Sequence, residues 1–155
     1  MTAPTTPTWD EFAAALRKEL GRMGDGILFV ISHREQPWHF AQFAQYLDET
    51  FAEVSGETVQ DPAVEEAPTP EGTRILESLG WAPPMRREGY RWHRSVPYPP
   101  TSAEYREIVD AVVVALRDVN GVPGPDHLTY RAWNGKDDNK PWPVELPGVR
   151  PEARS

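Results

Sequence analysis

Residues 101–119 read TSAEYREIVDAVVVALRDV and form the most regular amphipathic pattern in the chain. The segment opens with a capping box, in which the Thr101 hydroxyl can accept from the third backbone N–H and Glu104 can reach back to the cap. Behind this cap, apolar residues recur at spacings of three, four and seven, which is the period of one helical face. They are Tyr105, Ile108, Val109, Val112, Val113, Leu116 and Val119. The pattern predicts a helix whose apolar face forms the centre of the core.

A second helix and three strands are predicted upstream of this segment. Thr8-Trp9-Asp10-Glu11 repeats the capping-box pattern and opens another apolar stripe at helical spacing. After Asp25-Gly26 the period changes, because residues 27–31 (ILFVI) form a β-branched and aromatic run too short for an independent helix. Residues 38–47 and 50–55 are two more extended candidates with only two residues between them. So short a connection favours an antiparallel meander.

The remaining elements complete an α+β layer pattern. Thr69-Pro70 predicts the start of a short helix that ends at Gly80. Residues 89–94 (GYRWHR) alternate aromatic and basic side chains, which is typical of a half-exposed strand, and residues 126–133 form a short closing segment of undetermined type. We therefore expect one α+β domain with the order α-β-β-β-α-β-α, in which an antiparallel sheet of about 4–5 strands packs against helices.

Proline and charge divide the rest of the chain. Residues 1–7 are expected to be a flexible leader, and residues 8–133 the folded domain. Residues 134–155 are rich in proline and charge, and Trp142 and Leu146 are their only large apolar groups. We therefore expect this C-terminal stretch to be a flexible tail that adds little to the core.

An acidic stretch runs from residue 48 to residue 71. It holds eight Asp and Glu and no Lys or Arg, so its charge equals the −8 of the whole chain. The stretch is expected to be a solvated face, because proline punctuates its middle and prevents regular structure. A docking surface for a basic partner is the alternative.

Composition excludes several classes of function. Sixteen Lys and Arg against twenty-four Asp and Glu disfavour a nucleic-acid binder and a polybasic membrane anchor. The absence of Cys from the 155 residues excludes disulfides, thiolate metal sites and thiol nucleophiles. No apolar run approaches the roughly 20 residues of a membrane-spanning helix, and the N-terminus lacks the pattern of a secretory signal. We therefore expect no membrane insertion and a cytoplasmic location.

The sequence contains no motif for catalysis or for a cofactor. A Gly-x-Ser-x-Gly elbow, a Gly-x-Gly-x-x-Gly loop and a phosphate-binding loop ending in Gly-Lys-Ser/Thr are all missing. The histidines lack the i, i+4 spacing of zinc ligands on a helix, although the first two could flank one turn. They are His33, His39, His93 and His127. We expect no catalytic residue, no metal site and no cofactor, and we expect that the protein is not an enzyme.

Aromatic and polar side chains on the predicted strands are the candidates for contact with a partner, because exposed Trp is a favoured interface anchor. Gln42 and Glu53 are expected to pair across strands, with partner contact as the alternative. Residues 90–94 resemble a stacking platform for single-stranded nucleic acid, but the negative net charge favours strand packing with arginine stems laid along the surface. The candidate partner-binding residues are Trp38, Phe40, Gln42, Glu53, Trp81, Tyr90 and Trp92.

Five local sequences carry a family resemblance. They are Trp9-Asp10-Glu11-Phe12, Phe40-Ala41-Gln42-Phe43, Phe51-Ala52-Glu53-Val54-Ser55-Gly56, Leu76-Glu77-Ser78-Leu79-Gly80-Trp81-Ala82-Pro83-Pro84 and Pro125-Asp126-His127-Leu128-Thr129-Tyr130. In this order they resemble the actinobacterial TY-Chap domain, over about residues 8–133. The order of the predicted elements is similar to that of the superfamily of type III secretion chaperones and YbjN proteins.

The resemblance implies a non-enzymatic, chaperone-like or adaptor domain that binds a protein partner in a bacterial multi-component conflict or signalling system. It supplies no catalytic residue, and it leaves a homodimer open because related secretion chaperones commonly dimerise. The alternative is a small-molecule-binding domain or an enzyme with a pocket lined by Trp, His and Glu. A desolvated His or Glu in a cleft would favour that alternative, and an exposed apolar sheet face would favour the binding domain.

Overall fold

The computed structural model describes residues 6–55, 70–83 and 91–152. The elements in chain order are α1 (Trp9–Arg22), β1 (Ile27–His33), β2 (Phe40–Gln45), β3 (Glu49–Ser55), α2 (Pro70–Ser78), β4 (Arg91–Pro97), α3 (Ser102–Val114), a π-helical turn η1 (Ala115–Val119), a 3₁₀ turn η2 (Pro125–His127), β5 (Leu128–Asn134), β6 (Lys140–Pro141) and β7 (Arg150–Pro151). The predicted α+β class and the predicted order of helices and strands are confirmed.

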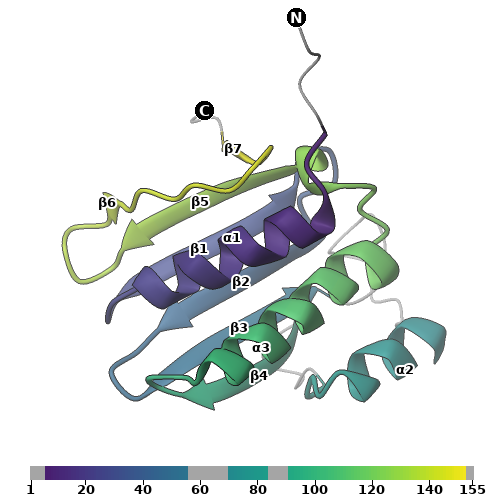
Figure 1. The fold of residues 1–155 in the computed structure, drawn as a ribbon, viewed down its shortest axis with the longest axis horizontal. Helices are drawn as coiled ribbons and strands as arrows, with labels where there is room; N and C mark the ends of the chain where they lie inside the picture. The colour runs from purple at the N-terminus through teal and green to yellow at the C-terminus, as the bar shows by residue number, and fades with distance from the viewer. Residues whose placement is uncertain (1–5, 56–69, 84–90, 153–155) are drawn as a thin grey trace, which may run out of the picture.

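The strands form one sheet in the order β4-β3-β2-β1-β5-β6, and β7 pairs with the other end of β5 from β6 (Figure 1). Neighbours in the first five positions are antiparallel, which confirms the predicted meander of β1, β2 and β3. The closing segment is the strand β5, which pairs with β1 along its whole length. The sheet is larger than the expected 4–5 strands because β6 and β7, of two residues each, form within residues 134–155.

Hydroxyl caps begin the two long helices, as the sequence predicts. Thr8 Oγ1 accepts from the Glu11 backbone N–H at 3.1 Å at the start of α1. At the start of α3 the capping box is complete, because Thr101 Oγ1 accepts from Glu104 N at 3.1 Å and Glu104 Oε1 accepts from Thr101 N at 3.0 Å. Each cap satisfies backbone donors that the first turn of a helix leaves without a partner.

The core lies between one face of the sheet and the helices α1 and α3, which cross in front of it in Figure 1. The largest side chains with almost no exposed surface come from the helices α1, α2 and α3, the turn η1 and the strands β1, β2 and β5. They include Phe12, Leu16, Phe29, Phe43, Ile108 and Leu116. The apolar stripes predicted for the two long helices are therefore confirmed as their core faces.

The C-terminal residues differ most from the expectation. Residues 140–152, which we call the strap, place Val144, Leu146 and Val149 in the core at 7–8 % exposure. Trp142 is half-buried against the same core. The flexible tail was predicted because residues 134–155 were expected to add little to the core. The buried side chains of the strap contradict that premise. Prolines interrupt these apolar residues, so the stretch shows neither the helical nor the strand period.

Two further expectations concern stretches that the structure describes only in part. In the leader, residues 1–5 lie outside the described residues, and Pro7 lies against the strap next to Gly148. In the acidic stretch, residues 56–69 lie outside the described residues, so a docking role for it stays a prediction. Among the described residues, no helix is long and apolar enough to cross a membrane.

Candidate functional site

The sheet face turned away from α1 and α3 carries half-buried apolar side chains. Alternation along β1 points Ile27, Phe29 and Ile31 toward the helices, so Leu28 and Val30 lie on the other face. The registers of the neighbouring strands extend this face across the sheet. We call it the outer face, and its residues include Leu28, Val30, Phe40, Gln42, Phe51, Glu53, Arg131 and Trp133.

A hollow of about 170 Å³ lies on the outer face between β1, β2, β3 and β5. Leu28, Val30, Phe51 and Trp133 supply much of its apolar lining, and Gln42 and Glu53 supply polar groups. Tyr46 also lines the hollow and is 46 % exposed. Its neighbour Leu47, in the turn between β2 and β3, is 75 % exposed. A contiguous group of accessible apolar side chains is typical of a binding surface.

Three predicted candidates lie on this face. Gln42 and Glu53 stand directly opposite each other, and Gln42 Nε2 donates to Glu53 Oε1 at 2.6 Å, which confirms the predicted cross-strand pair. Phe40 lies further along β2, opposite Ser32, and its ring is half-buried. At the other side of the face, the Arg131 guanidinium lies 4.9 Å from the centre of the Trp133 ring. This cation–π contact orients the half-buried Trp133 ring.

The other candidates lie elsewhere. Trp81 and Trp92 are each only 2 % exposed and belong to the core, so in this structure neither indole is available to a partner. The register explains the burial of Trp92, which stands opposite the buried Val54. Trp38 is half-buried in the loop between β1 and β2, with its ring 6.1 Å from that of His39. Tyr90 lies outside the described residues.

The basic and aromatic stretch is confirmed as a strand rather than a stacking platform. Trp92 points into the core, while Arg94 lies along the helical side and donates to Leu79 O at 2.7 Å. The same guanidinium forms an ion pair with Glu107 at 2.9 Å. Among the described residues of this stretch, the bases of a nucleic acid would therefore meet no row of exposed rings.

The first two histidines flank one turn, as the sequence suggested. His33 N donates to His39 O at 2.9 Å, and His33 Nδ1 accepts from the backbone N–H groups of Glu35 and Gln36 at 3.0 and 3.1 Å. Burial lowers the pKa of His33, an effect that Glu35 opposes and that His127 and Arg34 reinforce. This histidine is therefore a neutral acceptor that holds a turn, and it does not line the hollows described here. Within the described part of the chain, no group of three or more His, Asp or Glu is placed to hold a metal ion.

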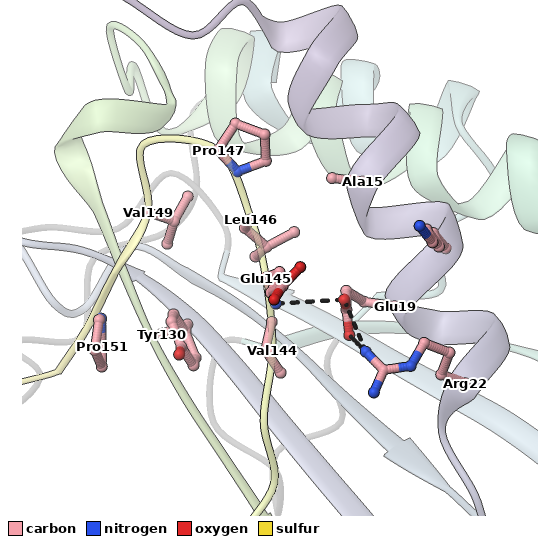
Figure 2. A pocket seen from close by; sticks show the side chains of 11 residues that line it. Ala15, Glu19, Arg22, Tyr130, Val144, Glu145, Leu146, Pro147, Val149 and Pro151 are labelled. Carbon is pink, nitrogen blue, oxygen red and sulfur yellow. Dashed lines mark hydrogen bonds and ion pairs between the residues drawn. The ribbon is translucent and has the colours of Figure 1, made fainter.

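A larger groove, of about 770 Å³, lies between α1 and the strap (Figure 2). Its lining comes from one side of α1, from Tyr130 of β5 and from the strap. These residues are Ala15, Lys18, Glu19, Arg22, Tyr130, Val144, Glu145, Leu146, Pro147, Val149 and Pro151. Figure 2 shows Glu19 turned toward the strap and tied to it. We call this hollow the α1–strap groove.

Glu19 is the buried charge of this groove. Its carboxylate accepts from Arg22 Nη1 at 3.0 and 2.9 Å and from the Glu145 backbone N–H at 3.3 Å. Sequence reasoning missed the groove because the strap was expected to be flexible. One signal was present, since Glu19 falls on the apolar stripe of α1, three residues after Leu16 and four before Met23. A charge on the core face of a helix needs a partner from another segment.

A family model described as "T3SS (YopN, CesT) and YbjN peptide-binding chaperone 3" matches residues 2–134. The matched range contains the elements from α1 through the end of β5. No curated protein and no solved structure matches the chain. Because the matched range covers well over half of the residues and contains the predicted elements in order, the chain belongs to the TY-Chap3 family of peptide-binding chaperones.

Proposed function

We propose that this protein is a non-enzymatic chaperone or adaptor whose outer face binds an extended, apolar segment of another protein. The family match supports a peptide as the ligand. One structural observation supports the location, namely the half-buried Leu28, Val30, Phe51 and Trp133 around a hollow on the face turned away from α1 and α3.

The chemistry of the outer face suits a peptide side chain better than a reaction. Covering the exposed part of its apolar groups with a partner removes them from water, at about 25 cal/mol for each Å² buried. The Trp133 ring, stacked under Arg131, has the character of an interface anchor. The Gln42–Glu53 pair and Arg131 place polar groups beside the apolar centre, which restricts the orientation of a bound segment.

The cellular setting in this proposal comes from the family resemblance. The resemblance supports a multi-component bacterial conflict or signalling system. The cytoplasm as the location is supported by an N-terminus without the pattern of a secretory signal. A second copy of the chain is a competing occupant of the outer face, because a dimer would cover the same apolar groups. The experiment below separates these occupants.

Two exposed tyrosines provide a matched test. Tyr46 borders the hollow on the outer face and is 46 % exposed, whereas Tyr98 is 39 % exposed and follows β4 near Tyr105 of α3, whose pKa it helps to raise. Peptides selected from a random display library on the full chain are measured against Tyr46→Ser and Tyr98→Ser by fluorescence anisotropy. We expect at least fivefold weaker binding to Tyr46→Ser and unchanged binding to Tyr98→Ser.

Equal effects of the two substitutions, or none from either, would contradict the proposed location. Light scattering on the full chain tests the competing occupant. A dimer mass that Val30→Asp converts to a monomer mass would assign the outer face to a second copy of this chain instead of a peptide.

A further inference from the structure

We propose that the strap is a displaceable, intramolecular peptide ligand, and that the site it occupies between α1 and β5 also binds a separate peptide with the same side-chain spacing. This second site does not depend on the outer face, so the two proposals fail independently. The family match supports a peptide as the ligand class, and the strap itself supplies the pattern.

The backbone of the strap pairs with the edge of β5. Without residues 135–152, β5 would be an edge strand, and edge strands present N–H and C=O groups to any added strand. The strap fills this edge as a bound peptide does. It pairs antiparallel with Trp133 and Asn134 through β6 and parallel with Thr129 and Tyr130 through β7. Strand addition at a sheet edge is a common mode of peptide recognition.

Single hydrogen bonds complete this edge pairing. Trp142 N donates to Ala132 O at 3.0 Å, and Glu152 N donates to Tyr130 O at 2.8 Å. Between these two points the strap leaves the strand and turns, with Val149 N donating to Leu146 O at 3.2 Å. The strap is therefore held at its two ends by pairings of two residues each, which is a short ladder compared with β1 and β5.

The strap inserts apolar side chains between α1 and β5. Val144, Leu146 and Val149 turn toward α1 and β5 and are buried, and Pro147 stands between the last two (Figure 2). Their positions define a pattern of aliphatic residues at i, i+2 and i+5. Backbone hydrogen bonds do not depend on the sequence, so this spacing sets the class of peptide that fits. It is a proline-containing segment that carries three aliphatic side chains and turns between its two paired ends.

The strap does not fill its site completely. The α1–strap groove keeps about 770 Å³ of open volume beside the strap, and Trp142 Nε1 is buried with no acceptor in the described part of the chain. A buried donor without a partner weakens the hold of the segment that carries it. The strap also lies beyond residue 134, where the family match ends. These observations fit a tethered ligand better than an inseparable part of the core.

The test uses the full chain and a labelled synthetic peptide of residues 139–152, NKPWPVELPGVRPE. Leu146→Ser/Val149→Ser in the chain weakens its own strap without touching α1 or β5. We expect the peptide to bind this variant at least tenfold more tightly than the wild-type chain, because the wild-type site is occupied. The same peptide carrying Leu146→Ser and Val149→Ser is the control and should bind neither chain. Tyr46→Ser, on the outer face, should leave this binding unchanged.

Equal affinity for the two chains, or no binding to a variant whose circular dichroism shows a native fold, would overturn the proposal. If the variant does not fold, hydrogen exchange of the wild-type chain tests whether the strap opens independently of the rest of the domain. We expect the amides of Trp142 and Glu152 to exchange at least tenfold faster than those of Phe29 and Phe43 in the centre of the sheet. Exchange of all four amides at one common rate would show that the strap opens only when the whole domain unfolds.

Discussion

Glu19 of α1 accepts a hydrogen bond from the backbone N–H of Glu145, a residue 126 positions later in the chain, at a distance of 3.3 Å. This carboxylate is 4 % exposed, so water compensates little of its charge. Arg22 supplies the countercharge from one helical turn away, and the strap supplies a neutral donor from outside the helix. The first helix and the last described segment are therefore joined through one buried acid.

Arg22→Leu should destabilise the domain, because it leaves the Glu19 carboxylate buried without its charged partner. We expect a loss of about 1–3 kcal/mol in the free energy of unfolding at pH 7, measured by urea denaturation. Lys18→Leu is the control, since Lys18 lies on the same helix and is exposed. The double variant Glu19→Leu/Arg22→Leu should recover part of the loss, because it leaves no orphaned charge. An Arg22→Leu protein as stable as Lys18→Leu would show that the buried pair contributes nothing.

Gly148→Ala should test the contact between the strap and the leader. Gly148 has a φ of 76°, and a Cβ placed on it would lie 2.2 Å from Cγ of Pro7. Gly121 is a matched control, because its φ is 70° and nothing lies within 4 Å of its added Cβ. Both alanines bear the strain of the left-handed region, of the order of 1 kcal/mol, and only Gly148→Ala adds a clash.

We expect Gly148→Ala to lower the thermal midpoint more than Gly121→Ala does. Pro7→Gly should remove the difference, since it deletes the atoms that the new methyl group meets. If the two alanine variants melt at the same temperature, residue 7 does not rest on the strap in solution.

The elements that the sequence predicted are those with a local signal. Thr8 and Thr101 mark the starts of helices through hydroxyl caps, and residues 27–31 mark a strand through a β-branched run. Residues 128–134 (LTYRAWN) carry no such signal, because β5 mixes apolar and charged positions. Its strand state follows from pairing with β1, which is a tertiary effect that local propensity does not contain.

The candidate site shows the same division. The Gln42–Glu53 pair was predictable because the meander places two polar residues on neighbouring strands. The face on which Trp92 lies could not be predicted, because a shift of one residue in the register of β4 would move this side chain to the other face of the sheet. Val144, Leu146 and Val149 had no period to reveal them, so their burial was visible only once α1 and β5 formed the groove that receives them.

His33→Asn should flatten the dependence of stability on pH below pH 6.5. Burial is the main cause of the lowered pKa of His33 in the folded chain, whereas the pKa in the unfolded chain is about 6.5. As the pH falls, the unfolded chain therefore takes up a proton before the folded chain does. The contribution of His33 to the free energy of unfolding is present above pH 6.5 and is lost as the pH falls toward its pKa in the folded chain. The Asn Oδ1 can accept from the Glu35 and Gln36 N–H groups in place of Nδ1, but it does not titrate.

The measurement is urea unfolding of both proteins at a series of pH values. The wild type should lose stability relative to His33→Asn as the pH falls from 6.5. Glu35→Gln serves as a check of sign, since the Glu35 charge raises the pKa of His33 and its removal should extend the loss to lower pH. Parallel curves for wild type and His33→Asn would show that this histidine does not govern acid stability.

Truncation after Asn134 should destabilise the domain, contrary to the expectation for a flexible tail. The cut removes the burial of Val144, Leu146 and Val149, each worth about 1.5–3 kcal/mol, and exposes the edge of β5 and the Glu19 carboxylate. At about 2–4 °C for each kcal/mol, the thermal midpoint should fall by roughly 10 °C or more. Adding the synthetic peptide of residues 139–152 should raise the midpoint of any folded fraction, because a ligand that binds only the native state stabilises it. A midpoint within about 2 °C of the full chain would mean that the strap is not docked in solution.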